Sequence, residues 1–115
     1  PLASTTEIVV NGSNEDDTVT VDFRSGNPLP SGGITFHGNG EDVDGDELMV
    51  LGGTFNSVTD NLLGPGEGNI DLESDGVIDI TYTGLEPVDE TGLIVPNRIF
   101  NVPAGVTDAV WIRHR

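Results

Sequence analysis

Residues 33–53 read GITFHGNGEDVDGDELMVLGG, and the fold prediction depends on this stretch. Two apolar runs typical of β-strands, Ile34-Thr35-Phe36 and Leu48-Met49-Val50-Leu51, lie on either side of a glycine-rich turn. Each close pair of carboxylates costs about 1 kcal/mol at a wet surface. The pattern therefore predicts a bound cation, and a ligand set made of oxygen atoms alone favours Ca²⁺. The turn contains five carboxylates in a span of seven residues. These candidate ligands are Glu41, Asp42, Asp44, Asp46 and Glu47.

An earlier part of the chain has the same layout. Residues 8–21 read IVVNGSNEDDTVTV and residues 34–50 read ITFHGNGEDVDGDELMV. Each contains a β run, a residue followed by glycine, an acidic loop and a second β run. We interpret this as an internal repeat of a strand–acidic loop–strand unit. The shorter loop, with Asn14, Asp16 and Asp17, predicts a second and weaker cation site.

The composition predicts an all-β chain. Of its 115 residues, 35% are hydrophobic and 5% aromatic, and Val, Ile, Thr, Gly and Asp outnumber the strong helix formers. Turn signals recur about every ten residues. A length of 115 residues fits a single domain, 1–115, in which residues 1–6 are a linker remnant. The start at Pro1, without methionine, predicts a piece excised from a longer chain.

Two architectures agree with the strand patterns. Continuous apolar runs such as Ile8-Val9-Val10 favour strands that are buried on more than one side. They predict a right-handed parallel β-helix or a related β-solenoid. By contrast, residues 77–82 alternate as a β-sandwich strand does. A β-sandwich is therefore the alternative.

The net charge of −16 excludes several partners. The chain has four arginines and no lysine, so it lacks the phosphate contacts that bind nucleic acid or an anionic membrane. No apolar run is long enough to predict membrane insertion. Without cysteine there are no disulfides, zinc–thiolate sites or thiol nucleophiles. Such a composition suits calcium-rich surroundings outside a cell or at its surface.

Catalysis is not predicted. Glycoside hydrolysis needs two carboxylates with unlike pKa values, one of them in an apolar pocket. Here the acids crowd into glycine-rich turns and few aromatic residues are present to stack on a sugar. His37 and His114 are isolated, and we interpret both as surface histidines. We interpret Asp75 with Asp71 or Asp79, and the pair Asp89-Glu90, as ordinary turn and strand-face residues.

Four phrases carry a resemblance to a known kind of module. They are DTVTVDF at residues 17–23, the loop at 26–35, the acidic turn before residues 48–53, and ITYTGLEP at 80–87, which is the most specific. Over roughly residues 7–110 the chain resembles a repeat module of very large secreted bacterial surface proteins of the planctomycete type. Such modules accompany hemolysin-type calcium-binding and cadherin-like repeats. The resemblance implies a stacked, calcium-stiffened β-helical element without catalytic residues.

Neither established calcium template fits the acidic turn. Residues 38–43 keep only part of the calcium nonapeptide, and no second copy follows. If Asp42 began an EF-hand loop, Gly45 would be at the fourth position, although the glycine belongs at the sixth. Gly53 would then occupy the twelfth position, where a bidentate glutamate belongs. The sequence therefore predicts a cation without predicting its coordination geometry.

These observations predict a calcium-stabilised structural module of an extracellular adhesin, coat or fibre protein. Its expected partners are neighbouring modules or copies of itself, because the ends of a solenoid leave strand edges unpaired. One alternative is a carbohydrate-binding or carbohydrate-cleaving β-helix domain that meets a surface glycan. A self-assembling extracellular filament subunit is another.

Overall fold

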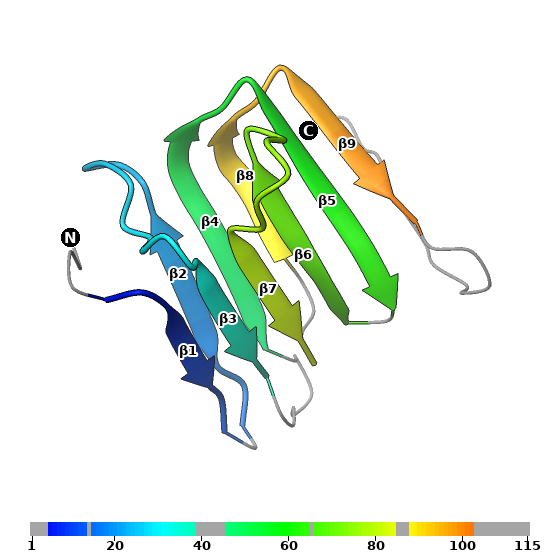
Figure 1. Ribbon diagram of the computed structural model, residues 1–115. Helices are drawn as coiled ribbons and strands as arrows, with labels where there is room; N and C mark the ends of the chain where they lie inside the picture. Colours follow the sequence, from blue (N-terminus) through cyan, green and yellow to red (C-terminus); the bar gives the residue numbers. More distant parts are fainter. Residues whose placement is uncertain (1–4, 14, 39–45, 65, 85–87, 103–115) are drawn as a thin grey trace.

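The computed structural model describes residues 5–13, 15–38, 46–64, 66–84 and 88–102, without the side chains of Asp89 and Thr91. Within these ranges it contains nine strands and no helix, which confirms the predicted all-β class (Figure 1). Most of the predicted linker, residues 1–4, lies outside the described part, and so does His114. The strands are β1 (Ile8–Asn11), β2 (Thr18–Asp22), β3 (Ile34–His37), β4 (Glu47–Thr54), β5 (Ser57–Gly64), β6 (Glu67–Leu72), β7 (Ile80–Thr83), β8 (Val88–Ile94) and β9 (Asn97–Asn101).

The strands form two sheets that lie one behind the other in Figure 1. The larger sheet has the order β1-β3-β7-β6-β5-β9, and the smaller has the order β2-β4-β8. The chain passes from the larger sheet to the smaller after β1, β3 and β7, and it returns after β2, β4 and β8. All neighbours pair in parallel except β6, which is antiparallel to both β5 and β7. The sheets are therefore parallel apart from one inserted strand.

The predicted repeat units lie side by side in register. Ile8 of β1 pairs with Ile34 of β3, and Val21 of β2 pairs with Val50 of β4. A third strand pair, which the sequence analysis did not find, continues both ladders. Its first strand, β7, pairs with β3, and its second strand, β8, pairs with β4. Because only residues 84–87 separate these two strands, the third pair lacks the long acidic loop that marks the other two.

A glycine follows the first strand of every unit, and close packing requires it. The N–H of Gly12 donates to the carbonyl of His37 at 2.7 Å, and the N–H of Gly38 donates to that of Thr83 at 2.8 Å. A Cβ atom on Gly38 would press against the carbonyl oxygen of Gly84 and lie 2.6 Å from Asp46 Oδ2. The glycine shared by the units is therefore the residue that lets successive turns stack.

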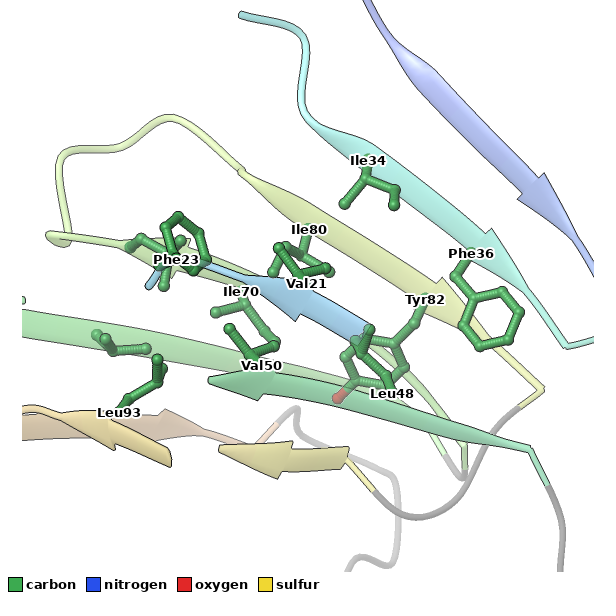
Figure 2. Packing of buried hydrophobic residues seen from close by; sticks show 12 residues of the cluster. Val21, Phe23, Ile34, Phe36, Leu48, Val50, Ile70, Ile80, Tyr82 and Leu93 are labelled. Atoms are coloured by element: carbon green, nitrogen blue, oxygen red, sulfur yellow. The ribbon is translucent and has the colours of Figure 1, made fainter. Parts of the chain in front are cut away.

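The core lies between the two sheets (Figure 2). Alternate residues of β3 and β7, and of the first half of β4, are buried there. Each such large apolar side chain contributes about 1.5–3 kcal/mol when it is fully buried. Phe23 and Phe55 meet edge to face beside the core, with ring centroids 5.3 Å apart. The alternating core residues are Ile34, Phe36, Ile80, Tyr82, Leu48 and Val50.

The turn before β7 corrects one local prediction. Residues 77–82 were expected to form one alternating strand, but β7 begins only at Ile80. Val77 is 54% exposed and Ile78 is 37% exposed, so these two apolar side chains lie outside the core. Instead, the segment before Ile80 belongs to the turn from β6, which is stabilised by carboxylate hydrogen bonds.

We predict that Gly38→Ala lowers the free energy of unfolding by about 2–4 kcal/mol, because the new methyl group would overlap backbone atoms of the next unit. Urea unfolding measures this. Gly26→Ala is the control for packing, since a Cβ at Gly26 meets nothing within 4 Å, although Gly26 has a positive φ of 116° and Gly38 does not. Gly26→Ala should lower the free energy of unfolding by only about 1 kcal/mol. Equal losses for the two variants would contradict the packing argument.

Candidate metal centre

Three aspartates gather at the turn that joins β6 to β7. Asp71 lies near the end of β6, Asp75 lies within the turn, and Asp79 immediately precedes β7. One carboxylate oxygen from each residue lies within 4.8 Å of those from the other two. Asp71 is buried, Asp79 is half-buried and Asp75 is exposed. A cation from solvent can therefore reach this group of oxygen atoms from the side of Asp75.

The backbone of this turn is held in an uncommon conformation. Glu73 and Ser74 have φ angles of 70° and 50°, in a region that costs a side-chain-bearing residue about 1 kcal/mol or more. Hydrogen bonds to residues at and just before the start of β5 offset this conformational cost. Ser74 Oγ lies 2.8 Å from Ser57 Oγ and 2.7 Å from Thr59 Oγ1, and Glu73 Oε1 accepts the N–H of Asn56 at 3.0 Å. The turn is thereby fixed against the sheet, and its carboxylates keep their positions.

Backbone N–H groups orient the buried carboxylates. Asp71 accepts hydrogen bonds from the N–H groups of Asp75 at 3.1 Å and Gly76 at 2.9 Å. Asp79 Oδ2 accepts the N–H of Leu72 at 2.8 Å. These bonds stabilise the carboxylates, but N–H dipoles carry no net charge. The negative charge of the cluster is therefore not neutralised by them.

Repulsion within the cluster shows in the pKa of Asp79. Burial raises this pKa above its ordinary value, and the charges of Asp75 and Asp71 raise it further, while the hydrogen bond from Leu72 acts in the opposite direction. A divalent cation between the three carboxylates would remove this repulsion. It would favour the ionised form of Asp79.

The described arginines do not supply the missing positive charge. Arg24 pairs with Asp22 at 2.8 Å, and Arg98 pairs with Glu90 at 3.0 Å. The Asp22 carboxylate accepts three hydrogen bonds from the Arg24 side chain and one from its backbone N–H. Both guanidinium groups are thus engaged away from the β6–β7 turn, so neither described arginine neutralises its carboxylates.

Two of the predicted cation ligands come together where the first two units stack. Asp46 is fully buried, and its Oδ1 accepts the N–H of Asp17 at 2.6 Å. The other oxygen, Oδ2, has no hydrogen-bond partner among the described residues. The Asp17 carboxylate accepts the N–H and the hydroxyl of Ser13, and these bonds lower its pKa. The sequence analysis assigned Asp46 and Asp17 to two separate cation sites, whereas the structure brings them into contact without a third described carboxylate, and their part in cation binding stays a prediction.

The remaining predicted ligands are less closely gathered. Glu47 is half-buried at the start of β4, where it pairs with Thr18 of β2, and Asp16 is exposed. Their part in cation binding stays a prediction. The other predicted ligands, Asn14, Glu41, Asp42 and Asp44, lie outside the described residues.

The sequence analysis interpreted the acids of the β6–β7 turn as ordinary turn and strand-face residues, although their spacing indicates a calcium loop. Counting from Asp71, acidic side chains stand at positions 1, 3, 5 and 9 and a glycine at position 6, as in an EF-hand calcium loop. The template was applied to residues 42–53, where it fails, and not to residues 71–82. Position 12 departs from it, because a buried tyrosine, Tyr82, stands where a bidentate glutamate is expected.

The chain matches no protein-family model, no curated protein and no solved structure. The resemblance to bacterial surface-protein modules therefore stays a prediction. The described residues contain no helix that is long and apolar enough to cross a membrane.

We predict that the double substitution Asp75→Asn and Asp79→Asn weakens divalent-cation binding at least tenfold, because two of the three converging carboxylates lose their charge. Isothermal titration calorimetry with CaCl₂ measures the affinity. The control removes the same charge from exposed positions, with Glu7→Gln and Glu67→Gln. If both double variants lost affinity equally, general electrostatic attraction would explain the binding.

Proposed function

We propose that this chain is a calcium-stabilised structural module of an extracellular adhesin, coat or fibre protein. The observation that carries the proposal is the convergence of Asp71, Asp75 and Asp79 within a turn that neither described arginine neutralises. A site built from carboxylates binds hard cations, and Ca²⁺ tolerates the irregular oxygen arrangement of such a turn better than Mg²⁺ does.

The spacing of the turn supports calcium in particular. In a calcium loop, positions 1, 5 and 9 correspond here to Asp71, Asp75 and Asp79, and position 7 contributes a backbone carbonyl, that of Val77. Glu73 at position 3 is engaged with Asn56 instead. The site would thus have fewer protein ligands than an EF-hand and would rely on water for the rest, which favours moderate affinity.

A cation in this turn would have a structural effect. Asp71 belongs to β6 and Asp79 precedes β7, so an ion held by both would fasten the inserted strand to the third repeat unit. The buried, unpartnered oxygen of Asp46 supports a second place for a cation, between the first two units. Both positions lie at turns, where ions neutralise charge without entering the apolar core.

The architecture that we propose is a right-handed parallel β-helix interrupted by one hairpin. Three units paired in parallel support it, and crossovers between parallel strands are almost always right-handed. Among the described residues, β1 lies at one end of the larger sheet and β9 at the other. Several large apolar residues at the β8–β9 end are exposed, which supports stacking on neighbouring modules or on further copies. They are Ile94, Ile99, Phe100 and Val102.

We expect millimolar calcium to raise the unfolding temperature over its value in EDTA by about 10 °C. A ligand present at about 100 times its dissociation constant stabilises the folded state by about 2.7 kcal/mol, and about 4 °C follows from each kcal/mol in a domain slightly longer than about 100 residues. Differential scanning calorimetry measures the shift, with NaCl of equal ionic strength as the control. Identical unfolding temperatures in calcium and in EDTA would refute the calcium part of the proposal.

A further inference from the structure

An aspartate lies in the core away from the candidate metal centre. Asp60 occupies an inward position of β5, where it pairs with Ile70 of β6 and Phe100 of β9, and it is only 3% exposed. Its Oδ2 has no hydrogen-bond partner among the described residues when the group is treated as a carboxylate. A buried carboxylate with a free oxygen is costly, so this position requires an explanation.

Glu90, on the opposite sheet, is the partner that explains the buried position of Asp60. Its carboxyl group, on β8, is hydrogen-bonded to that of Asp60, and two carboxyl groups can share such a bond only if one carries a proton. Arg98 of β9 fixes Glu90 from the other side, with Nη1 at 3.0 Å from Oε1 and Nη2 at 3.2 Å from the backbone carbonyl. The Glu90 side chain is 11% exposed. The contact thus joins β5, β8 and β9.

The charges of Asp60, Glu90 and Arg98 balance only if one of the two carboxyl groups carries a proton. The titratable groups that face Asp60 from the surrounding strands are Glu90 on β8, Arg98 on β9 and Tyr82 on β7. One guanidinium neutralises one of the two carboxylates, and the tyrosine is neutral. The second carboxylate would remain as an uncompensated charge in the core, whereas one shared proton makes the group neutral.

We propose that Asp60 and Glu90 hold one proton between them and that this proton fastens β8 to β5, so that the β8–β9 end of the protein opens more readily as the pH rises. The carboxyl pair, Asp60 and Glu90, is then a pH-sensitive contact between the two sheets. It acts independently of cation binding at the β6–β7 turn.

The electrostatics agree with the geometry. Burial raises the pKa of Asp60, and the hydrogen bond and the charge of Glu90 raise it further, to about 9, although Arg98 opposes the shift. Burial, together with the charges of Asp60 and Glu90, raises the pKa of Tyr82 to about 12. Tyr82 therefore stays neutral over the range in which Asp60 titrates.

The sign of the pH dependence follows from these values. An aspartate exposed by opening has a pKa near 3.8, whereas the closed state keeps its proton up to about pH 9. Opening therefore releases one proton between these two values. The opening equilibrium should rise about tenfold per pH unit over this range and level off above it.

Hydrogen exchange measured by mass spectrometry between pH 6 and 9, in constant saturating calcium, tests this behaviour. After correction for intrinsic exchange rates, protection of β8 and β9 amides in the native protein should fall about tenfold per pH unit, while protection of β1 and β3 should change little. Asp60→Asn should abolish the dependence, because an amide donates to Glu90 at every pH. Asp22→Asn, at a half-buried position of β2, should behave as the native protein does.

A second measurement keeps the proposal testable if Asp60→Asn does not fold. Carbon-detected NMR of the native protein, labelled at aspartate carboxyl carbons, should show the Asp60 carboxyl still protonated at pH 7. Titration of Asp60 below pH 6, or protection of β8 and β9 that does not depend on pH, would overturn the proposal. Failure of calcium binding would leave both measurements unaffected.

Discussion

Parallel stacking of successive strand pairs is the constraint on which the structure depends. Because β1 pairs with β3 and β2 with β4 in register, equivalent residues of successive units lie directly beside one another. Apolar residues benefit, since they form continuous rows in the core. Acidic turn residues are also brought together, and in a chain with a net charge of −16 this repulsion must be balanced.

The described residues balance buried negative charge in three ways. Backbone N–H groups solvate Asp71 and one oxygen of Asp46. A guanidinium and, as we propose, a shared proton neutralise the pair formed by Asp60 and Glu90. At the β6–β7 turn the described residues supply neither a guanidinium nor enough hydrogen-bond donors, which is why we propose a cation there. The three solutions share one cause, namely the near absence of positively charged side chains.

The sequence was informative wherever the deciding pattern was local. Residues 8–21 and 34–50 share a layout in the sequence, with a glycine after each first strand, and the structure pairs their strands in parallel register. The third unit was missed because the hairpin of β5 and β6 separates it from the second and because its connecting loop is short. Neither feature changes the pairing of its strands, but both hide the repeat in the sequence.

Contacts between distant residues were beyond local reasoning. Glu90 was interpreted as an ordinary strand-face residue, and its contact with Asp60 depends on how two different sheets face each other. Asp46 was predicted as a ligand from the crowding of acids, and its burial against Asp17 follows from the register of β2 and β4. The β6–β7 turn was within reach, since the spacing of Asp71, Asp75 and Asp79 is a local feature.

Charge compensation by a cation at the β6–β7 turn is the central claim, and anomalous X-ray diffraction from crystals grown with calcium tests it most directly. We predict an anomalous peak at roughly 2.3–2.6 Å from carboxylate oxygens of Asp71, Asp75 and Asp79. A turn that holds only water in crystals saturated with calcium would contradict the claim.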